Sequence, residues 1–251
     1  MSETCSIRLN KALADAGLCS RRKADELIRD GAVAVNGTVT CELGRRVLPS
    51  DTISVHGKTL RPPQARTWLM MNKPVQVVST AHDPEGRLTV LDILPEPWKQ
   101  LRLFPVGRLD YFSEGLILLT DDGDLAHTLL HPSHQIPKTY HLLVREKPDE
   151  RILQTLRTGM RLAEGEQLAP VQVRILPFSA RLPYFPSYGV LLEIILMQGV
   201  NRQIRRMCRD VKLTVLRLAR VAHGAILLGD LLPGGVRGLR DDEIASLRSM
   251  M

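Results

Sequence analysis

Apolar residues in the first sixty positions repeat with the period of a helix and then with that of a strand. Residues 9–16 and 21–30 carry apolar side chains at helical spacing, and Ser20 is a good N-cap for the second of these segments. Asn36-Gly37 lies between two short β-branched runs and is a strong signal for a tight hairpin turn. A further short strand is predicted at 52–55. This part of the chain therefore predicts two helices followed by a small hairpin.

The rest of the chain predicts a mixture of strands and helices. Short apolar runs that are bounded by glycine, proline or polar turn residues indicate strands. They are found at 69–71, 75–78, 101–106, 116–120, 140–144, 171–176, 190–197 and 215–218. Helical spacing is found at 125–130, 152–158, 202–211 and 241–250. Residues 181–188 contain two prolines and three aromatics, which predicts a loop inserted between neighbouring strands.

Two consecutive prolines separate these patterns. Pro62 and Pro63 resist both helix and sheet, so they predict a linker. The predicted organisation is a first domain over 1–62, a linker at 63–67 and a second domain over 68–251.

Composition narrows the class of protein. The chain has 251 residues, 44% of them hydrophobic, and 34 Lys+Arg against 27 Asp+Glu give a net charge of +7. This balance favours a polyanionic partner but does not distinguish nucleic acid from an anionic membrane surface. No apolar run approaches the roughly 20 residues that span a bilayer, and the N-terminus lacks the features of a signal peptide. The four cysteines form no Cys-x-x-Cys pair, which predicts reduced thiols and a cytoplasmic protein without a membrane partner.

Three segments carry candidate chemistry. The first, 106–116, contains Arg108 and Asp110 in a loop between two apolar runs, where a carboxylate is costly unless something pairs with it or uses it. The second follows Gly199, where seven Lys+Arg accompany one acid as far as Arg220. The third is the strand 138–144, in which Tyr140 shares a face with two aliphatic residues. From spacing alone, a capped turn and a half-buried sheet tyrosine are the more common interpretations of the first and third segments, and a solvated basic helix stays open for the second.

Metal and nucleotide chemistry find little support in the sequence. His127 and His131 could share a helical face, but Pro132 ends the helix and no further ligand is evident. Residues 120–124 are too short for a calcium loop, and the chain has no Gly-x4-Gly-Lys-Ser/Thr motif. We therefore expect neither a metal nor another cofactor.

The motifs themselves closely resemble those of a known family. Gly107-Arg108-Leu109-Asp110 with Gly115, Lys138-Thr139-Tyr140 and Arg202-Gln203-Ile204-Arg205-Arg206-Met207 resemble, in this order, the three motifs of RNA pseudouridine synthases. The resemblance implies a mixed, mainly antiparallel-sheet catalytic domain in which Asp110 is the catalytic aspartate. It also implies that Arg205 pairs with Asp110 and keeps it ionised, and that Tyr140 lies beneath the target base. Arg108 would position the flipped nucleotide, and Lys138, Arg202, Gln203 and Arg206 would contact the RNA.

The first domain resembles the S4 RNA-binding domain over about sixty residues. The matching segments are 8–11, 19–24 and 31–37. Arg8, Lys11, Ser20, Arg21, Arg22 and Lys23 are the expected RNA contacts, because the start of the second helix and the adjacent basic side chains together favour phosphate. The predicted fold class is therefore α+β, with a small S4 domain before the synthase domain.

The resemblance predicts a monomer that isomerises one uridine of ribosomal RNA, most similar to the enzymes of the large subunit. The same chemistry on small-subunit ribosomal RNA or on transfer RNA remains an alternative, as does a non-catalytic RNA-binding factor for ribosome assembly. Whether Asp110 attacks the sugar or removes a proton from it also stays open.

Overall fold

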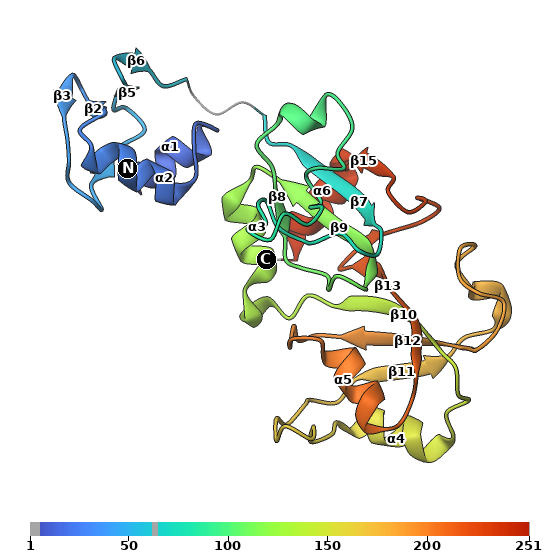
Figure 1. Cartoon of the computed structure of the whole chain (residues 1–251). Helices are drawn as coiled ribbons and strands as arrows, with labels where there is room; N and C mark the ends of the chain where they lie inside the picture. Colours follow the sequence, from blue (N-terminus) through green and yellow to red (C-terminus); the bar gives the residue numbers. More distant parts are fainter. Residues whose placement is uncertain (1–5, 62–64, 251) are drawn as a thin grey trace. The chain divides into compact units, whose positions relative to one another are not determined.

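The structure, a computed structural model, describes residues 6–61 and 65–250 (Figure 1). The described residues divide into two compact units. One contains the residues up to Thr67 together with Asp121–Gly123, and the other contains Trp68–Thr120 and the residues from Asp124 onward. The predicted boundary at 62 and part of the predicted 63–67 linker lie outside the described residues, as does Cys5.

The smaller unit has two helices and more strands than the sequence predicted. Helices α1 (Leu9–Asp15) and α2 (Arg21–Arg29) pack on the buried faces of short strands. Four of these form an antiparallel sheet in the order β3 (Thr38–Val39), β2 (Val33–Val35), β5 (Ile53–Val55) and β6 (Lys58–Thr59), while β1 (Ile7–Arg8) pairs with β4 (Arg46–Val47). The predicted hairpin around Asn36-Gly37 is confirmed, and so is the N-cap, because Ser20 Oγ accepts a hydrogen bond from the Lys23 amide at 3.1 Å.

A mixed sheet organises the larger unit. Its main path runs β11-β12-β10-β13-β9-β7-β15, with β14 paired to β13 and β8 to β9. The strands are β7 (Trp68–Lys73), β8 (Phe104–Val106), β9 (Glu114–Thr120), β10 (Lys138–Val144), β11 (Gln172–Ile175), β12 (Val190–Leu196), β13 (Val215–His223), β14 (Ile226–Leu227) and β15 (Val236–Gly238). Pairing is antiparallel except between β13 and β9, as the prediction of a mainly antiparallel sheet requires.

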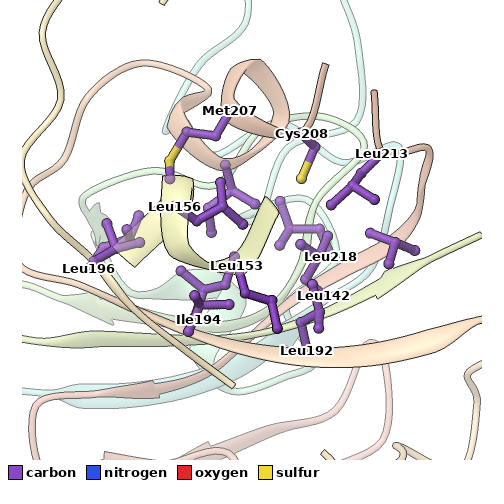
Figure 2. Close-up of a cluster of buried hydrophobic side chains, with 14 of the residues drawn as sticks. Leu142, Leu153, Leu156, Leu192, Ile194, Leu196, Met207, Cys208, Leu213 and Leu218 are labelled. Carbon is purple, nitrogen blue, oxygen red and sulfur yellow. The ribbon is translucent and has the colours of Figure 1, made fainter. Parts of the chain in front are cut away.

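Helices cover this sheet through two apolar clusters. Helices α4 (Glu150–Thr158) and α5 (Gln203–Asp210) contribute Leu153, Leu156 and Met207 to a cluster with Leu142 and Leu192 of the sheet (Figure 2). Helices α3 (Gly123–Leu130) and α6 (Asp241–Ser249) contribute to a second cluster with β7, β8 and β9. Short 3₁₀ turns lie at Trp98–Gln100, Pro132–His134 and Phe178–Ala180. The buried apolar face of α5 fixes the orientation of the motif that begins at Arg202.

Strand β13 is longer than predicted and contains a bulge. Thr139 of β10 is opposite Ala222, whereas the next residue, Tyr140, is opposite Arg220, so Val221 is extra. Because side chains alternate between the two faces of a strand, one extra residue moves the following side chains to the other face. The bulge therefore turns Arg220 and His223 toward the same side of the sheet.

A predicted strand and a predicted loop have different outcomes. The predicted strand at 75–78 is wrong, because Gln76 has a positive φ of 63° and only Val78 forms an isolated bridge, to Thr89. The predicted loop at 181–188 is confirmed. It lies between the paired strands β11 and β12, and Phe185 packs on Leu143 and Ala219. Within the described residues, the helices are all too short or too polar to cross a membrane.

Candidate active site

One pocket of about 940 Å³ in the larger unit gathers most of the predicted synthase residues. Its lining is drawn from the 106–113 loop, the first half of β10, the beginning of α5 and the second half of β13. Of the residues predicted from the sequence it contains Arg108, Asp110, Lys138, Tyr140, Arg202, Gln203 and Arg205. Three motifs that are far apart in the chain therefore meet in one cavity.

The loop that carries Asp110 is held in place by hydrogen bonds from residues that were not predicted to belong to the site. Ser79 Oγ accepts a hydrogen bond from the Leu109 amide at 3.1 Å and donates one to the Leu109 carbonyl at 2.9 Å. The Gln76 amide donates to the Tyr111 carbonyl at 2.7 Å. The segment mistaken for a strand therefore serves as the support of this loop. A lone serine after an apolar run gives no sequence signal for that role.

Gly115 lets two strands approach closely beside the loop. Its φ is +100°, and a Cβ at this position would lie 2.3 Å from the carbonyl oxygen of Arg220. The parallel register pairs Gly115 with Arg220, so any larger residue would push β13 away from β9. The glycine of the motif is therefore required by the backbone that positions Asp110.

Arg205 reaches from α5 to this loop. Its Nη2 donates to the Phe112 carbonyl at 2.6 Å and to Ser113 Oγ at 3.2 Å. Its Nε is 3.9 Å from Oδ2 of Asp110 and has no hydrogen-bond partner among the described residues. Burial lowers the pKa of Arg205, and the Asp110 carboxylate acts in the opposite direction. Arg205 thus anchors the backbone of the loop and also presents a free N–H to the carboxylate.

Lys73 is a second cation near this loop, and it lies in the interior. Its ammonium donates to the carbonyls of Pro74 and Val77, both at 2.8 Å. Burial lowers the pKa of Lys73 to about 8, while the charges of Glu114 and Asp110 oppose this shift. Lys73 therefore contributes to the field at Asp110 while it fixes the supporting segment. Its position at the end of an apolar run could have identified it as a buried charge.

The floor of the pocket is formed by β10 and β13. Tyr140 is half-buried, packs against two apolar clusters and stands opposite Arg220 in the sheet. Arg220 and His223 are 2% and 1% exposed, and both line the pocket. Neither was selected from the sequence as a site residue, because the predicted strand ended at Leu218. Charged or imidazole side chains within an extended apolar run would have been the signal.

His223 is held in its neutral form. Burial lowers its pKa well below 6.5, and the charges of Arg220 and Lys138 lower it further. In the unfolded chain the imidazole takes up a proton near pH 6.5, whereas in the folded protein it does not. Below that pH the unfolded state therefore binds more protons, and the free energy of unfolding falls.

We expect the free energy of unfolding to decrease from pH 7.5 to 5.5, with His223 contributing up to about 1.4 kcal/mol per pH unit below pH 6.5. Urea titrations followed by tryptophan fluorescence report on the larger unit, because Trp68 and Trp98 both lie there. A His223→Gln variant should have a flatter pH dependence. The exposed His82→Gln should behave like the unchanged protein, and equal slopes for all three proteins would contradict this assignment.

Arg202 and Arg206, the other predicted arginines of this motif, differ in position, since only Arg202 lines the pocket. Arg202 is exposed at the N-terminus of α5 with a φ of 49°. Arg206 does not line the pocket, and it pairs with Glu164 and Glu166 at 3.3 and 2.7 Å. Arg205 and Arg206 were both expected to act at the synthase site. The helix instead directs one toward the pocket and the other toward two carboxylates, so an RNA contact by Arg206 stays a prediction.

In the smaller unit the predicted RNA contacts lie at the start of α2 and on β1 and α1. Arg21, Arg22 and Lys23 are exposed, and Lys23 pairs with Glu26 at 2.7 Å within the helix. Arg8 is exposed beside α1, and Lys11 pairs with Asp15 at 2.8 Å. The exposed pair of Lys23 with Glu26 contributes little to stability and leaves Lys23 able to exchange partners.

The described residues contain no group of three His, Cys, Asp or Glu side chains arranged to hold a metal ion. The rings of His127 and His131 are 6.0 Å apart, and those of His131 and His134 are 6.1 Å apart. Helix α3 ends at Leu130, as Pro132 predicted.

An S4-like unit and a synthase-like pocket together define a class of RNA-modifying enzyme. The family model for RNA pseudouridylate synthase matches residues 67–210, and the model for the S4 domain matches residues 7–53. The chain therefore belongs to the RNA pseudouridine synthase family, and its substrate is RNA.

Individual relatives match this chain over nearly its whole length. The chain is 37% identical to the ribosomal large subunit pseudouridine synthase B of Bacillus subtilis, over 97% of this chain and 96% of the relative. It is 34% identical to the dual-specificity RNA pseudouridine synthase RluF of Escherichia coli, over 96% and 78% of the two chains. A crystal structure of a pseudouridylate synthase superimposes with a TM-score of 0.66 at 27% identity, covering 96% of this chain and all of that one.

Proposed function

We propose that this protein, acting as a monomer, converts one uridine of large-subunit ribosomal RNA into pseudouridine. The observation that carries the proposal is the meeting of Asp110, Arg205 and Tyr140 in one pocket. Each comes from a different motif, and all are supplied by a single chain. The substrate is suggested by the names of the relatives from Bacillus subtilis and from Pseudomonas aeruginosa, both of which are ribosomal large subunit pseudouridine synthase B.

The reaction requires few groups. The N1–C1′ bond of the uridine breaks, C5 joins the same sugar carbon, the proton on C5 leaves and N1 takes up a proton. Asp110 is the group beside the sugar, either as the nucleophile at C1′ or as the base that removes a sugar proton, and both routes need an ionised carboxylate. Arg205 places its guanidinium beside this carboxylate, with Nε 3.9 Å from Oδ2 of Asp110. Tyr140 packs on the base and accepts the C5 proton.

The uridine must leave its stack to enter this pocket. Arg108 is exposed at the rim, where it can hold the flipped nucleotide by its phosphate. Lys138, Arg202 and Gln203 line the same cavity and are the other proposed contacts within it.

Release of tritium from ribosomal RNA labelled with [5-³H]uridine tests the chemistry directly, because the label leaves only when C5 reacts. Mass mapping of pseudouridines in the ribosomal RNA of a deletion strain then identifies the position. Loss of a single pseudouridine from large-subunit RNA is the expected result. A missing site in small-subunit or transfer RNA would replace the proposed substrate, and RNA binding without tritium release would favour a non-catalytic assembly factor.

The S4 unit is proposed to hold the RNA through the start of α2. Arg21 and Arg22 are exposed and take part in none of the ion pairs between described residues, so they are available to phosphates. Arg21→Glu combined with Arg22→Glu should weaken RNA binding and flatten its salt dependence by about one unit of slope per lost phosphate contact. Turnover at saturating RNA should remain, because the proposed catalytic groups belong to the other unit.

Filter binding at several salt concentrations measures this effect. The matched control is Arg29→Glu with Lys58→Glu, which changes the net charge equally at two other exposed positions of the same unit. An identical salt slope for both double variants would mean that the start of α2 is not the contact surface.

A further inference from the structure

A second feature of the pocket lies on β10 and β13, beside Tyr140. Lys138 is opposite His223 in the register, and Tyr140 is opposite Arg220. The bulge at Val221 brings Arg220 and His223 to one face, and both line the pocket together with Lys138. We call these three side chains the basic recess.

The basic recess has hydrogen-bonding capacity that the protein does not use. Arg220 donates from Nε to the Leu116 carbonyl at 2.7 Å, but its buried Nη2 has no partner among the described residues. Neither ring nitrogen of His223 has one. Lys138 donates to the Ile136 carbonyl at 2.9 Å, which leaves further N–H groups of its ammonium. Unpaired polar groups of this kind are costly to bury unless a ligand completes them.

The charge of the recess is also uncompensated. The described part of the chain gives neither Lys138 nor Arg220 a carboxylate partner within ion-pair distance. Each of these cations acts on its neighbours only unfavourably, since Arg220 lowers the pKa of Lys138 and both lower that of His223. Two partly desolvated cations beside a neutral imidazole favour an anion with several acceptor oxygens.

We propose that the basic recess binds a phosphodiester of the substrate RNA strand, next to the target uridine. The proposal rests on the proposed function, because it takes the strand that brings the uridine to Tyr140. Lys138 and Tyr140 are two residues apart on β10, which is about 7 Å along a strand. That separation suits a base on the tyrosine and a backbone phosphate in the recess. A carbonyl of uracil would leave both positive charges without a counterion.

His223 has a particular part in this arrangement. Because it stays neutral, it adds a hydrogen-bond donor without adding a third positive charge to a site that receives one negative charge. Arg220 and Lys138 supply the charge, and the imidazole N–H helps to fix the position of the phosphate. The recess is therefore a positioning site for the strand, separate from the Asp110 loop on which the chemistry depends.

Phosphate interference with the full-length protein tests the proposal without relying on a buried variant that fails to fold. A stem-loop with the target uridine is prepared with a neutral methylphosphonate at each of the neighbouring linkages in turn. Loss of one charge-assisted contact should weaken binding by about 10- to 100-fold at one linkage and little at the others. Uniform small effects at every linkage would overturn the proposal.

Variants then assign that linkage to the recess. In Lys138→Gln and in His223→Gln, a methylphosphonate at the sensitive linkage should weaken RNA binding much less than in the unchanged protein. The contact to that phosphate is already weakened in both variants. Lys147→Gln removes an exposed lysine that does not line the pocket, and it should retain the full effect. Retention of the full effect in both recess variants would place the phosphate elsewhere.

Two further measurements distinguish a site for free phosphate from a site for the RNA strand, and the basic recess from the proposed chemistry. Inorganic phosphate that competes with RNA while no linkage is sensitive would show a site for the free ion and overturn the assignment to the RNA strand. Tritium release from the unmodified stem-loop reports the proposed function separately. The interference pattern in binding decides on the basic recess whether or not chemistry at C5 is observed.

Discussion

Replacing Asp110 with asparagine is expected to reduce turnover by at least about a thousand-fold and to change RNA affinity by less than about threefold. An amide has the size of the carboxylate, but it is neither ionised nor nucleophilic. Both proposed routes at the sugar need the charge, so the variant should lose the chemical step rather than binding.

The structure indicates that this substitution leaves the loop intact. The loop is fixed through the backbone of Leu109, Tyr111 and Phe112, and none of these hydrogen bonds involves the Asp110 side chain. The carboxylate itself is 28% exposed and reaches Arg205 only at 3.9 Å. A loss of activity in Asp110→Asn can therefore be attributed to the missing carboxylate.

Single-turnover tritium release and gel-shift affinity, measured on the same RNA, separate the two effects. Asp230→Asn is a suitable control, because it makes the same chemical change in an exposed turn outside this pocket. Turnover by Asp110→Asn above about a thousandth of the unchanged protein would show that another group carries the chemistry.

Local patterns were sufficient to predict most helices and strands, because each element repeats its apolar residues with its own period. The predictions failed where specific hydrogen bonds, rather than the apolar pattern, decide the conformation. Residues 75–78 have the composition of a strand, yet Lys73 binds the Val77 carbonyl and Gln76 binds the Tyr111 carbonyl. These contacts turn the segment into a support for the Asp110 loop, and periodicity cannot reveal them.

The residues of the candidate site were also predicted in part from the sequence. Motif resemblance selected Asp110, Tyr140 and Arg205, and the structure places all three in one pocket. It did not select Arg220 or His223, whose side chains share a face only because of the extra residue in β13. A bulge has no local sequence signature here. The distinction between Arg205 and Arg206 was equally hidden, since it depends on where Glu164 and Glu166 lie in the fold.

Replacing Arg205 with leucine should have the second large effect. It removes the guanidinium beside Asp110 and also the hydrogen bonds from Nη2 to Phe112 and Ser113, so the acid loses its ion-pair partner and the loop loses one of its anchors. We expect the rate at saturating RNA to fall by about 100- to 1,000-fold, while affinity falls less than about tenfold.

Arg205→Lys distinguishes this role from a phosphate contact. Lysine keeps the charge, but a single ammonium cannot reproduce both the contacts of Nη2 and the N–H that faces Asp110. Partial activity is therefore expected, well above that of the leucine variant. Arg209 is an exposed arginine of the same helix and pairs with Glu164. Arg209→Leu should leave the rate nearly unchanged. If the leucine and lysine variants lose rate and affinity equally, Arg205 is one phosphate contact among several. If the rate falls alone and lysine restores part of it, the guanidinium acts on the Asp110 loop.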